Sequence, residues 1–293
     1  MMKLFSKLGI GTVQFGLDYG VANSSGQTSE HEVREIMNFS LQNHIDTLDT
    51  AIAYGQSERV LGDVGIDHWK VVTKLPNYPN DCIDVDEWVN EQFSQSLTRL
   101  KQKRVYALLL HRPSDLLTNY GETLYKCLSD LKSNGLIEKL GVSVYSPSEL
   151  SPILDRFDVD LVQAPVNIFD RSFEISGLGE KLKESGIEFH ARSIFLQGLL
   201  LMKAESRPEK FSKWNKSFEA FDKWLAINNK TALEAALKYV DQLSFVDKLI
   251  VGVNSKVNLE QILAALGSSC GDIPVFYDYE DLRLITPSRW SEL

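Results

Sequence analysis

Short apolar runs alternate with segments of helical periodicity along the whole sequence. The runs are rich in Val, Ile and Leu, and the segments between them repeat apolar residues at helical spacing. The apolar runs cover residues 8–13, 45–49, 69–74, 105–110, 137–144, 161–164, 187–191 and 248–251. Strands that alternate with helices form parallel sheets, and eight such units close into a barrel. The sequence therefore predicts an α/β fold, a (β/α)8 TIM barrel whose parallel eight-stranded barrel is surrounded by helices.

Length and composition agree with one domain. A chain of 293 residues is ordinary for a single α/β barrel, and a hydrophobic fraction of 43% supplies a large core. No linker or change in composition divides the sequence, so residues 1–293 are expected to form a single barrel domain. One interruption is expected, because a polar insertion containing Trp and Phe breaks the alternation between Ser193 and Asn228.

Charge and cysteine content limit the partners and the compartment. The net charge of −9 argues against nucleic acids and anionic membranes, which both require a basic surface. The start of the chain lacks the apolar region of a secretion signal, and no apolar run approaches the length of a membrane span. Cys82, Cys127 and Cys270 lack C-x-x-C spacing, so neither a disulfide framework nor a metal site is indicated. We expect a cytoplasmic protein, and the sequence says nothing about its oligomeric state.

Three successive strands are expected to end in ionisable side chains. Asp49 closes the second apolar run, and Tyr54 follows shortly after it, before a glycine. Lys74 ends the third run and His111 follows the fourth. Active sites of α/β barrels lie at the carboxyl ends of the strands. These four side chains are therefore expected to share a pocket.

The four residue types fit the chemistry of carbonyl reduction. Singly they have ordinary structural explanations, such as a helix N-cap for Asp49 or a satisfied core histidine for His111. A tyrosine hydroxyl is a weak acid, with a pKa of about 10. A nearby ammonium lowers that value, and a carboxylate holds the ammonium in place. Because a neutral imidazole can orient a carbonyl, the set predicts a general-acid site that protonates an oxygen while hydride adds to the carbon.

The stretches around these residues resemble the active-site motifs of the aldo/keto reductases. The matching stretches are residues 48–55, 72–75 and 109–113, and the resemblance extends from Leu8 to about Pro287. The family is a (β/α)8 barrel that reduces carbonyl compounds with NADPH. The resemblance implies that Tyr54 is the proton donor, that Lys74 and Asp49 tune it, and that His111 orients the carbonyl.

The resemblance also implies where a cofactor binds. Gly141 to Ser143 is similar to a motif whose serine holds the nicotinamide amide, and Gln163 matches a carboxamide-binding glutamine. Arg192 to Gly198 aligns with the pyrophosphate loop, and Gly252 to Gln261 aligns with the adenosine-phosphate loop. The expected cofactor-binding residues are Gly11, Thr12, Asp49, Ser143, Gln163, Arg192, Ser193, Phe195, Gln197, Gly198, Gly252, Asn254, Lys256, Asn258 and Gln261.

Some of these positions depart from the family pattern. Arg192 replaces an aromatic residue that stacks on the nicotinamide, although a planar guanidinium can also stack. Asn254 stands where a basic residue is often found, and Ile262 stands where an asparagine usually closes the motif. Lys256 is the only cation in the adenosine-phosphate loop. We therefore expect a modest preference for NADPH, about tenfold, with NAD as the other candidate.

Two other functions remain open from the sequence. A barrel retained as a nucleotide-sensing or regulatory subunit would bind the cofactor with little turnover, but the complete set of four side chains favours an enzyme. An aldolase-type barrel would form a Schiff base on Lys74 and would leave Tyr54 and His111 without roles. The substrate is expected to be a small carbonyl compound, with sugar-like compounds among the candidates. It is expected to contact residues 15–19, 78–81 and 193–228, because loops at this end vary freely.

Overall fold

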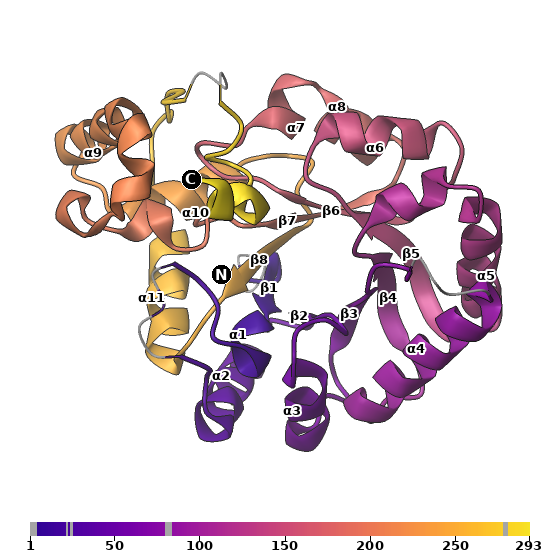
Figure 1. Cartoon of the computed structure of the whole chain (residues 1–293). Helices are drawn as coiled ribbons and strands as arrows, with labels where there is room; N and C mark the ends of the chain where they lie inside the picture. The colour runs from indigo at the N-terminus through magenta and orange to yellow at the C-terminus, as the bar shows by residue number, and fades with distance from the viewer. Residues whose placement is uncertain (1–4, 22, 24–25, 80–83, 278–280) are drawn as a thin grey trace.

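The computed structural model describes residues 5–21, 23, 26–79, 84–277 and 281–293. In these residues, parallel strands pair in chain order and close into a barrel, as the alternation predicted (Figure 1). The first and last strands also pair, with Gly11 opposite Gly252. The strands are β1 (Leu8–Gly11), β2 (Thr47–Asp49), β3 (Lys70–Leu75), β4 (Val105–Leu110), β5 (Ile137–Ser143), β6 (Leu161–Pro165), β7 (Glu188–Arg192) and β8 (Lys248–Gly252).

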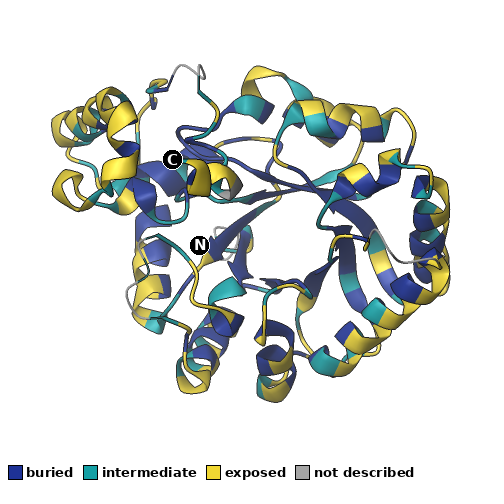
Figure 2. Ribbon diagram, in the orientation of Figure 1, coloured by how far each residue is buried: buried dark blue, intermediate teal, exposed yellow. Residues whose placement is uncertain are grey.

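Helices surround the barrel, with buried faces towards the strands and exposed faces outwards (Figure 2). The α-helices are α1 (Val13–Gly16), α2 (Glu30–Gln42), α3 (Ser57–Val64), α4 (Val85–Leu100), α5 (Gly121–Ser133), α6 (Pro147–Leu154), α7 (Ser172–Ile175), α8 (Leu178–Glu184), α9 (Asn215–Asn228), α10 (Ala232–Asp241) and α11 (Lys256–Leu266). The 3-10 helices are η1 (Pro113–Leu117), η2 (Leu199–Leu201), η3 (Ala204–Ser206), η4 (Glu209–Trp214) and η5 (Pro287–Glu292). In the described part of the chain, no helix combines the length and the apolar character needed to cross a membrane.

Side-chain caps fix where several helices begin. In the sequence, Ser29 precedes apolar residues at helical spacing, from Val33 to Leu41, which predicts a capped helix with these residues on its buried face. The cap is confirmed, because the Ser29 side chain accepts a hydrogen bond from the backbone N–H of Glu32. Thr231 and Glu234 form a reciprocal capping box at the start of α10. The Ser255 side chain caps α11 in the same manner, by accepting from the N–H of Asn258. Each cap satisfies a backbone donor that the first helical turn leaves unpaired.

A partly buried ionic cluster lies towards the amino-terminal ends of the strands. Glu188 accepts a hydrogen bond from Tyr106 at 2.6 Å and also pairs with Lys139. The same carboxylate lies 2.6 Å from Nε2 of His190, whose side chain is fully buried. These contacts hold the pKa of Glu188 well below its usual range despite burial, which alone would raise it. The cluster occupies strand positions away from the carboxyl ends, so it belongs to the framework of the barrel.

Several boundaries differ from the sequence expectation. The first strand ends at Gly11, and α1 begins at Val13. The segment between the fourth and fifth apolar runs predicts one helix over about 114–133, but it forms two helices, η1 and α5. They meet closely at Gly121, where a Cβ atom would lie 1.9 Å from the carbonyl oxygen of Leu116. Leu41, expected on the buried face of α2, is 40% exposed.

The insertion after β7 is mostly helical, containing η2, η3, η4 and α9, and it packs against the C-terminal segment. Figure 1 shows α9 outside the ring of helices. Phe211 meets Trp290 edge to face with ring centroids 4.8 Å apart, and Phe221 meets Phe276 at 5.4 Å. The Trp and Phe side chains noted in the sequence therefore extend the main apolar core to the insertion and the C-terminal segment. This packing holds the C-terminal segment next to the carboxyl ends of the strands, where Pro287 lines a cavity.

Candidate active site

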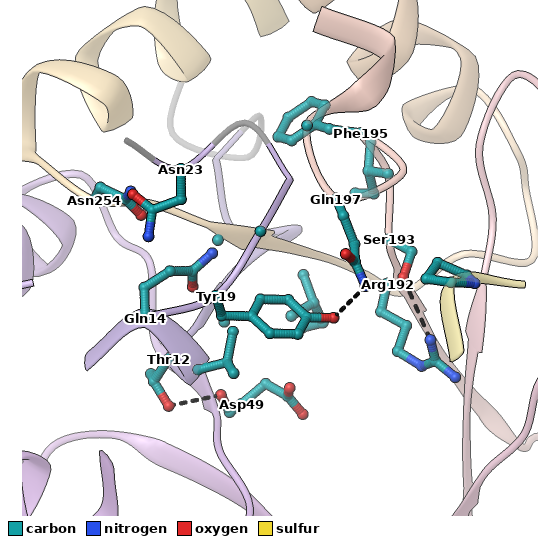
Figure 3. Close-up of a pocket in the computed structure, with 18 of the residues that line it drawn as sticks. Thr12, Gln14, Tyr19, Asn23, Asp49, Arg192, Ser193, Phe195, Gln197 and Asn254 are labelled. Atoms are coloured by element: carbon teal, nitrogen blue, oxygen red, sulfur yellow. Dashed lines mark hydrogen bonds between the residues drawn. The ribbon is translucent and has the colours of Figure 1, made fainter. Parts of the chain in front are cut away.

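A cavity of about 710 Å³ opens at the carboxyl ends of the strands. Its wall includes the last residues of five strands, namely Gly11, Asp49, Ser143, Arg192 and Gly252. Figure 3 shows side chains from widely separated parts of the chain converging on this space. A volume of this size is typical of sites for cofactors and small molecules. Its position is the one expected for the active site of a barrel of this kind.

A buried ion pair lies at the base of the cavity. Nζ of Lys74 is 2.7 Å from Oδ1 of Asp49 and donates a second hydrogen bond to the carbonyl oxygen of Thr50 at 2.8 Å. Lys74 is fully buried and Asp49 is only 4% exposed. Burial lowers the pKa of Lys74, and the Asp49 carboxylate opposes that shift. The two groups therefore depend on each other, since a buried charge without its partner is strongly destabilising.

Tyr54 and His111 complete the group that the sequence brought together. Nζ of Lys74 lies 5.0 Å from the centroid of the Tyr54 ring. The rings of Tyr54 and His111 meet edge to face, with centroids 5.9 Å apart. Tyr54 is followed by Gly55, whose φ of +56° suits glycine, and a Cβ there would lie 2.6 Å from the carbonyl oxygen of Gly16. The Tyr-Gly pair thus sets the turn that places the hydroxyl in the cavity wall.

The electrostatics of this group differ in one respect from the sequence expectation. Burial, followed by the charge of Asp49, raises the pKa of Tyr54, whereas the charge of Arg192 lowers it. The sequence led us to expect a lowered pKa for Tyr54, whereas burial and the charge of Asp49 make the net shift upward. Burial also lowers the pKa of His111 to about 4, assisted by the charges of Lys74 and Arg192. At neutral pH the imidazole is uncharged, as a hydrogen-bonding group for a carbonyl oxygen should be.

Most of the expected cofactor-binding residues line the cavity. They are Gly11, Thr12, Asp49, Ser143, Arg192, Ser193, Phe195, Gln197, Gly198, Gly252, Asn254, Asn258 and Gln261. Gln163 is fully buried behind this wall, and its Nε2 donates to Oδ1 of Asp49 at 2.6 Å. Its Oε1 has no hydrogen-bond partner among the described residues. A buried oxygen without a partner is uncommon in proteins, and a bound amide would satisfy it.

Lys256 does not line the cavity. Its Nζ lies 3.7 Å from a carboxylate oxygen of Glu35 and 5.5 Å from the centroid of the Phe39 ring, both on α2. Its backbone N–H donates to the carboxylate of Glu32 at 2.6 Å. An acidic side chain thus occupies the beginning of α11, where the sequence led us to expect a phosphate. The expected contact of Lys256 with a cofactor phosphate stays a prediction, and in this structure the ammonium is paired with Glu35.

Two long loops meet across the cavity. Nε2 of Gln197, after β7, donates to the hydroxyl of Tyr19 at 2.8 Å, and Nδ2 of Asn254 donates to Oδ1 of Asn23 at 2.7 Å (Figure 3). Leu196 and Gln197 both have positive φ, which is strained for these residue types and often marks a functional loop. The loop after β1 therefore lies over the cavity between β7 and β8.

Sequence reasoning missed several cavity residues, Gln14 and Tyr145 among them, and only partly located the substrate loops. Gln14 lines the cavity, and its Oε1 is buried with no hydrogen-bond partner in the part of the chain that the structure describes, yet no local pattern marks it. Tyr145 follows Val144 after β5 and was not singled out. Tyr19 was expected among the substrate loops and does line the cavity. Tyr78, by contrast, is buried against Trp88, and residues 80–81 of the same expected loop lie outside the described residues.

Comparison with known proteins agrees with this geometry. The model of the aldo/keto reductase family matches residues 7–269. The aldo-keto reductase YhdN of Bacillus subtilis is 28% identical over 189 residues, which cover 59% of this chain and 54% of that protein. This chain therefore spans about half the length of that relative.

Solved structures share the fold. An aldo-keto reductase from Bacillus halodurans, solved in its holo form, superposes with a TM-score of 0.73 at 20% identity and covers 96% of this chain and 91% of its own. A glycerol dehydrogenase from Gluconobacter oxydans superposes with a TM-score of 0.69 at 21% identity, covering 91% and 88%. The match of the family model over most of the chain, on a closed barrel of parallel strands, shows that this protein belongs to the aldo/keto reductase family.

Proposed function

We propose that this protein reduces an aldehyde or ketone to an alcohol, with Tyr54 as the proton donor and a nicotinamide dinucleotide as the source of hydride. One observation carries the proposal. The Lys74–Asp49 ion pair lies beneath the ring of Tyr54, and an uncharged His111 faces that ring inside a cavity of sufficient size. Family membership supports an oxidoreductase, and this arrangement supports the assignment of its acid.

The residues present fit the proposed cofactor. The unpaired Oε1 of Gln163 could accept a hydrogen bond from the nicotinamide carboxamide, and Ser143 lies in the adjacent wall. The loop from Ser193 to Gly198 supports the proposed pyrophosphate contact, since several of its residues have left-handed backbone conformations that can turn N–H groups towards an anion. When bound, the reduced dinucleotide supplies a hydride, which is two electrons and a hydrogen nucleus, to the carbonyl carbon.

Side chains of this protein protonate and orient the carbonyl oxygen of the substrate. The Tyr54 hydroxyl donates its proton to the carbonyl oxygen as the C=O π bond breaks, which yields the alcohol and a tyrosinate. His111, held neutral, donates a hydrogen bond that orients the same oxygen. Lys74 and Arg192 supply positive charge that opposes the effect of burial on the tyrosinate. Water restores the tyrosine proton after the product leaves.

The Schiff-base alternative finds little support. Nζ of Lys74 is fully buried and already donates to Asp49 and to the carbonyl oxygen of Thr50. A nucleophilic lysine needs a free amine that faces the substrate. An assay of reduced cofactor consumption with a panel of aldehydes, with Tyr54→Phe as the control, tests the reductase proposal directly.

The pH profile is expected to report the ionisation of His111. Because burial lowers its pKa to about 4, the imidazole stays neutral over the whole neutral range. As the pH falls through that value the ring takes up a proton, and kcat/KM should then decrease. Measuring kcat/KM from pH 8 to the lower limit of stability checks this. A decrease centred near the ordinary histidine value, about 6.5, would show that the ring is not shielded as described.

The structure changes the expected cofactor preference. The 2′-phosphate of NADPH carries close to two negative charges, and at the start of α11 it would meet the carboxylate of Glu32, while Lys256 is paired with Glu35. A ribose hydroxyl, by contrast, can donate to a carboxylate. We therefore expect NADH to bind at least as tightly as NADPH. Glu32→Gln should tighten NADPH by about tenfold, or 1.4 kcal/mol, and change NADH much less.

Fluorescence titration of both reduced cofactors measures these dissociation constants without turnover. Glu30→Gln is the matched control, because Glu30 is an exposed acid in the same first turn of α2. A wild-type preference for NADPH of tenfold or more, or a Glu32→Gln variant with unchanged affinities, would place the 2′-phosphate contact elsewhere.

A further inference from the structure

Arg192 ends β7 and faces the cavity with much of its hydrogen-bonding capacity unused. Its Nη2 donates to the carbonyl oxygen of Val144 at 3.1 Å, and its Nη1 donates to Oγ of Ser193 at 3.3 Å. A guanidinium has five N–H donors, so these two bonds leave three. One face of the group lies over the ring of Tyr145, with Cζ 4.6 Å from its centroid. The side chain is thus held in place while its edge stays available.

Arg192 gives the cavity a positive charge. Among the described residues that line the cavity, only Asp49 and Arg192 carry a formal charge at neutral pH, because His111 is neutral there. Asp49 is matched by Lys74. Arg192 forms no ion pair with any described residue. The cavity therefore has a net positive charge, although the whole chain has a net charge of −9.

Asp170, an acid whose pKa the charge of Arg192 influences, is buried and bonded to another partner. Asp170 accepts hydrogen bonds from the backbone N–H and the hydroxyl of Ser172, at 3.3 Å and 2.8 Å. Arg192 acts on this carboxylate only at longer range, and burial raises the pKa of Asp170 to about 6. The same guanidinium also opposes the charge of Lys74. The guanidinium is half-buried at the cavity wall, so an anion that enters the cavity can reach its unmatched charge.

We propose that Arg192 binds an anionic group of the substrate, so that carbonyl compounds bearing a carboxylate are the preferred substrates. This inference rests on the proposed function and specifies the substrate class of the same site. The planar edge of a guanidinium matches a carboxylate with two parallel hydrogen bonds, which gives orientation as well as affinity. Tyr145 and Val144 fix that edge so that little side-chain freedom is lost on binding.

Two other uses of the same charge make different predictions. The guanidinium could contact the pyrophosphate of the cofactor, in which case its removal would weaken cofactor binding. It could instead serve only to favour the tyrosinate of Tyr54, in which case its removal would slow charged and neutral substrates equally. If Arg192 binds an anion of the substrate, its removal should abolish the preference for an acid over its neutral ester. Neither of the other two uses predicts that result.

The test compares each acid with its methyl ester. The aldehydes are glyoxylate, succinic semialdehyde and para-formylbenzoate, which place the carboxylate at three different separations from the carbonyl. The corresponding hydroxy acids and hydroxy esters serve as binding probes, measured by isothermal titration calorimetry on the protein saturated with oxidised cofactor. This second readout does not depend on turnover.

For at least one pair, the wild type should bind the hydroxy acid about tenfold or more tightly than its ester. The corresponding aldehyde should show the same preference for the acid over the ester in kcat/KM. Arg192→Gln should bring both ratios close to one, and Arg192→Lys should retain part of them because it keeps the charge but loses the planar fork. The control is Arg59→Gln, which removes an exposed charge of α3 from outside the cavity lining and should keep the wild-type ratios.

Three results would overturn the proposal. The first is a wild type that binds no acid more tightly than its ester. The second is a pair of folded Arg192 variants that keep the wild-type ratio. The third is an Arg192→Gln variant whose loss lies in cofactor affinity while the ratio is unchanged. If acids bind in an Arg192-dependent manner but no aldehyde is reduced, the reductase proposal fails and the anion site stands.

Discussion

Replacing Tyr54 by phenylalanine is expected to lower the turnover of any carbonyl substrate by about 10²- to 10⁴-fold, which is the usual contribution of a positioned general acid. The change removes one oxygen and keeps the ring that contacts His111 edge to face and lies over Nζ of Lys74. The cavity should keep its shape, and cofactor affinity should hardly change. Steady-state kinetics and a cofactor titration on the same preparation measure both quantities.

The neighbouring Tyr145 provides a matched control. Tyr145 also lines the cavity, and Tyr145→Phe removes an oxygen from the same kind of ring. We expect a much smaller effect on turnover, because this ring supports Arg192 and is not placed over the Lys74–Asp49 pair. If Tyr54→Phe reduced carbonyls at a rate near that of the wild type, the proton would have to come from another group.

Removing Lys74 is expected to damage both activity and stability. Lys74→Met leaves the Asp49 carboxylate buried without its cation, which should lower the free energy of unfolding by about 3–5 kcal/mol. The uncompensated carboxylate should also raise the pKa of Tyr54 further, since Asp49 already acts in that direction. Turnover should therefore fall by on the order of 10²-fold or more. Chemical denaturation and kinetics measure the two effects separately.

A double variant separates the structural role of the pair from its chemical role. Asp49→Asn together with Lys74→Met removes both charges, so most of the lost stability should return, because neither charge is left alone. Turnover should not return, because the cation near Tyr54 is still missing. A stable double variant with wild-type activity would show that the pair serves only the fold.

The barrel could be predicted from the sequence because the alternation of short apolar runs with helical segments determines this fold. Strand β4 begins and ends where the apolar run does, and the cap at Ser29 lies where the pattern of α2 requires it. The boundaries that were missed depend on contacts between distant residues. The break between η1 and α5 follows from the close approach of Gly121 to Leu116. Local periodicity contains no information about such an approach.

The same distinction applies to the site. Asp49, Lys74 and His111 could be placed together because strand ends of a parallel barrel share one rim. The direction of the Tyr54 pKa could not be predicted, because it depends on how completely the ring is buried and on the neutralising effect of Asp49. The position of Lys256 could not be predicted either, since the acids that attract it lie on α2, far away in the sequence.

Transfer of a labelled hydride tests the central proposal most directly. The protein is mixed with an aldehyde and with reduced cofactor that carries deuterium at one face of the nicotinamide C4 position, and the alcohol is analysed by mass spectrometry. Because the cofactor would lie in one orientation in the cavity, the label from one face should appear on the former carbonyl carbon and the label from the other face should not. The Tyr54→Phe variant should form the same labelled product far more slowly. Absence of deuterium in the alcohol, or absence of any alcohol from wild-type protein that binds the cofactor, would contradict the assignment of this cavity as a carbonyl reductase site.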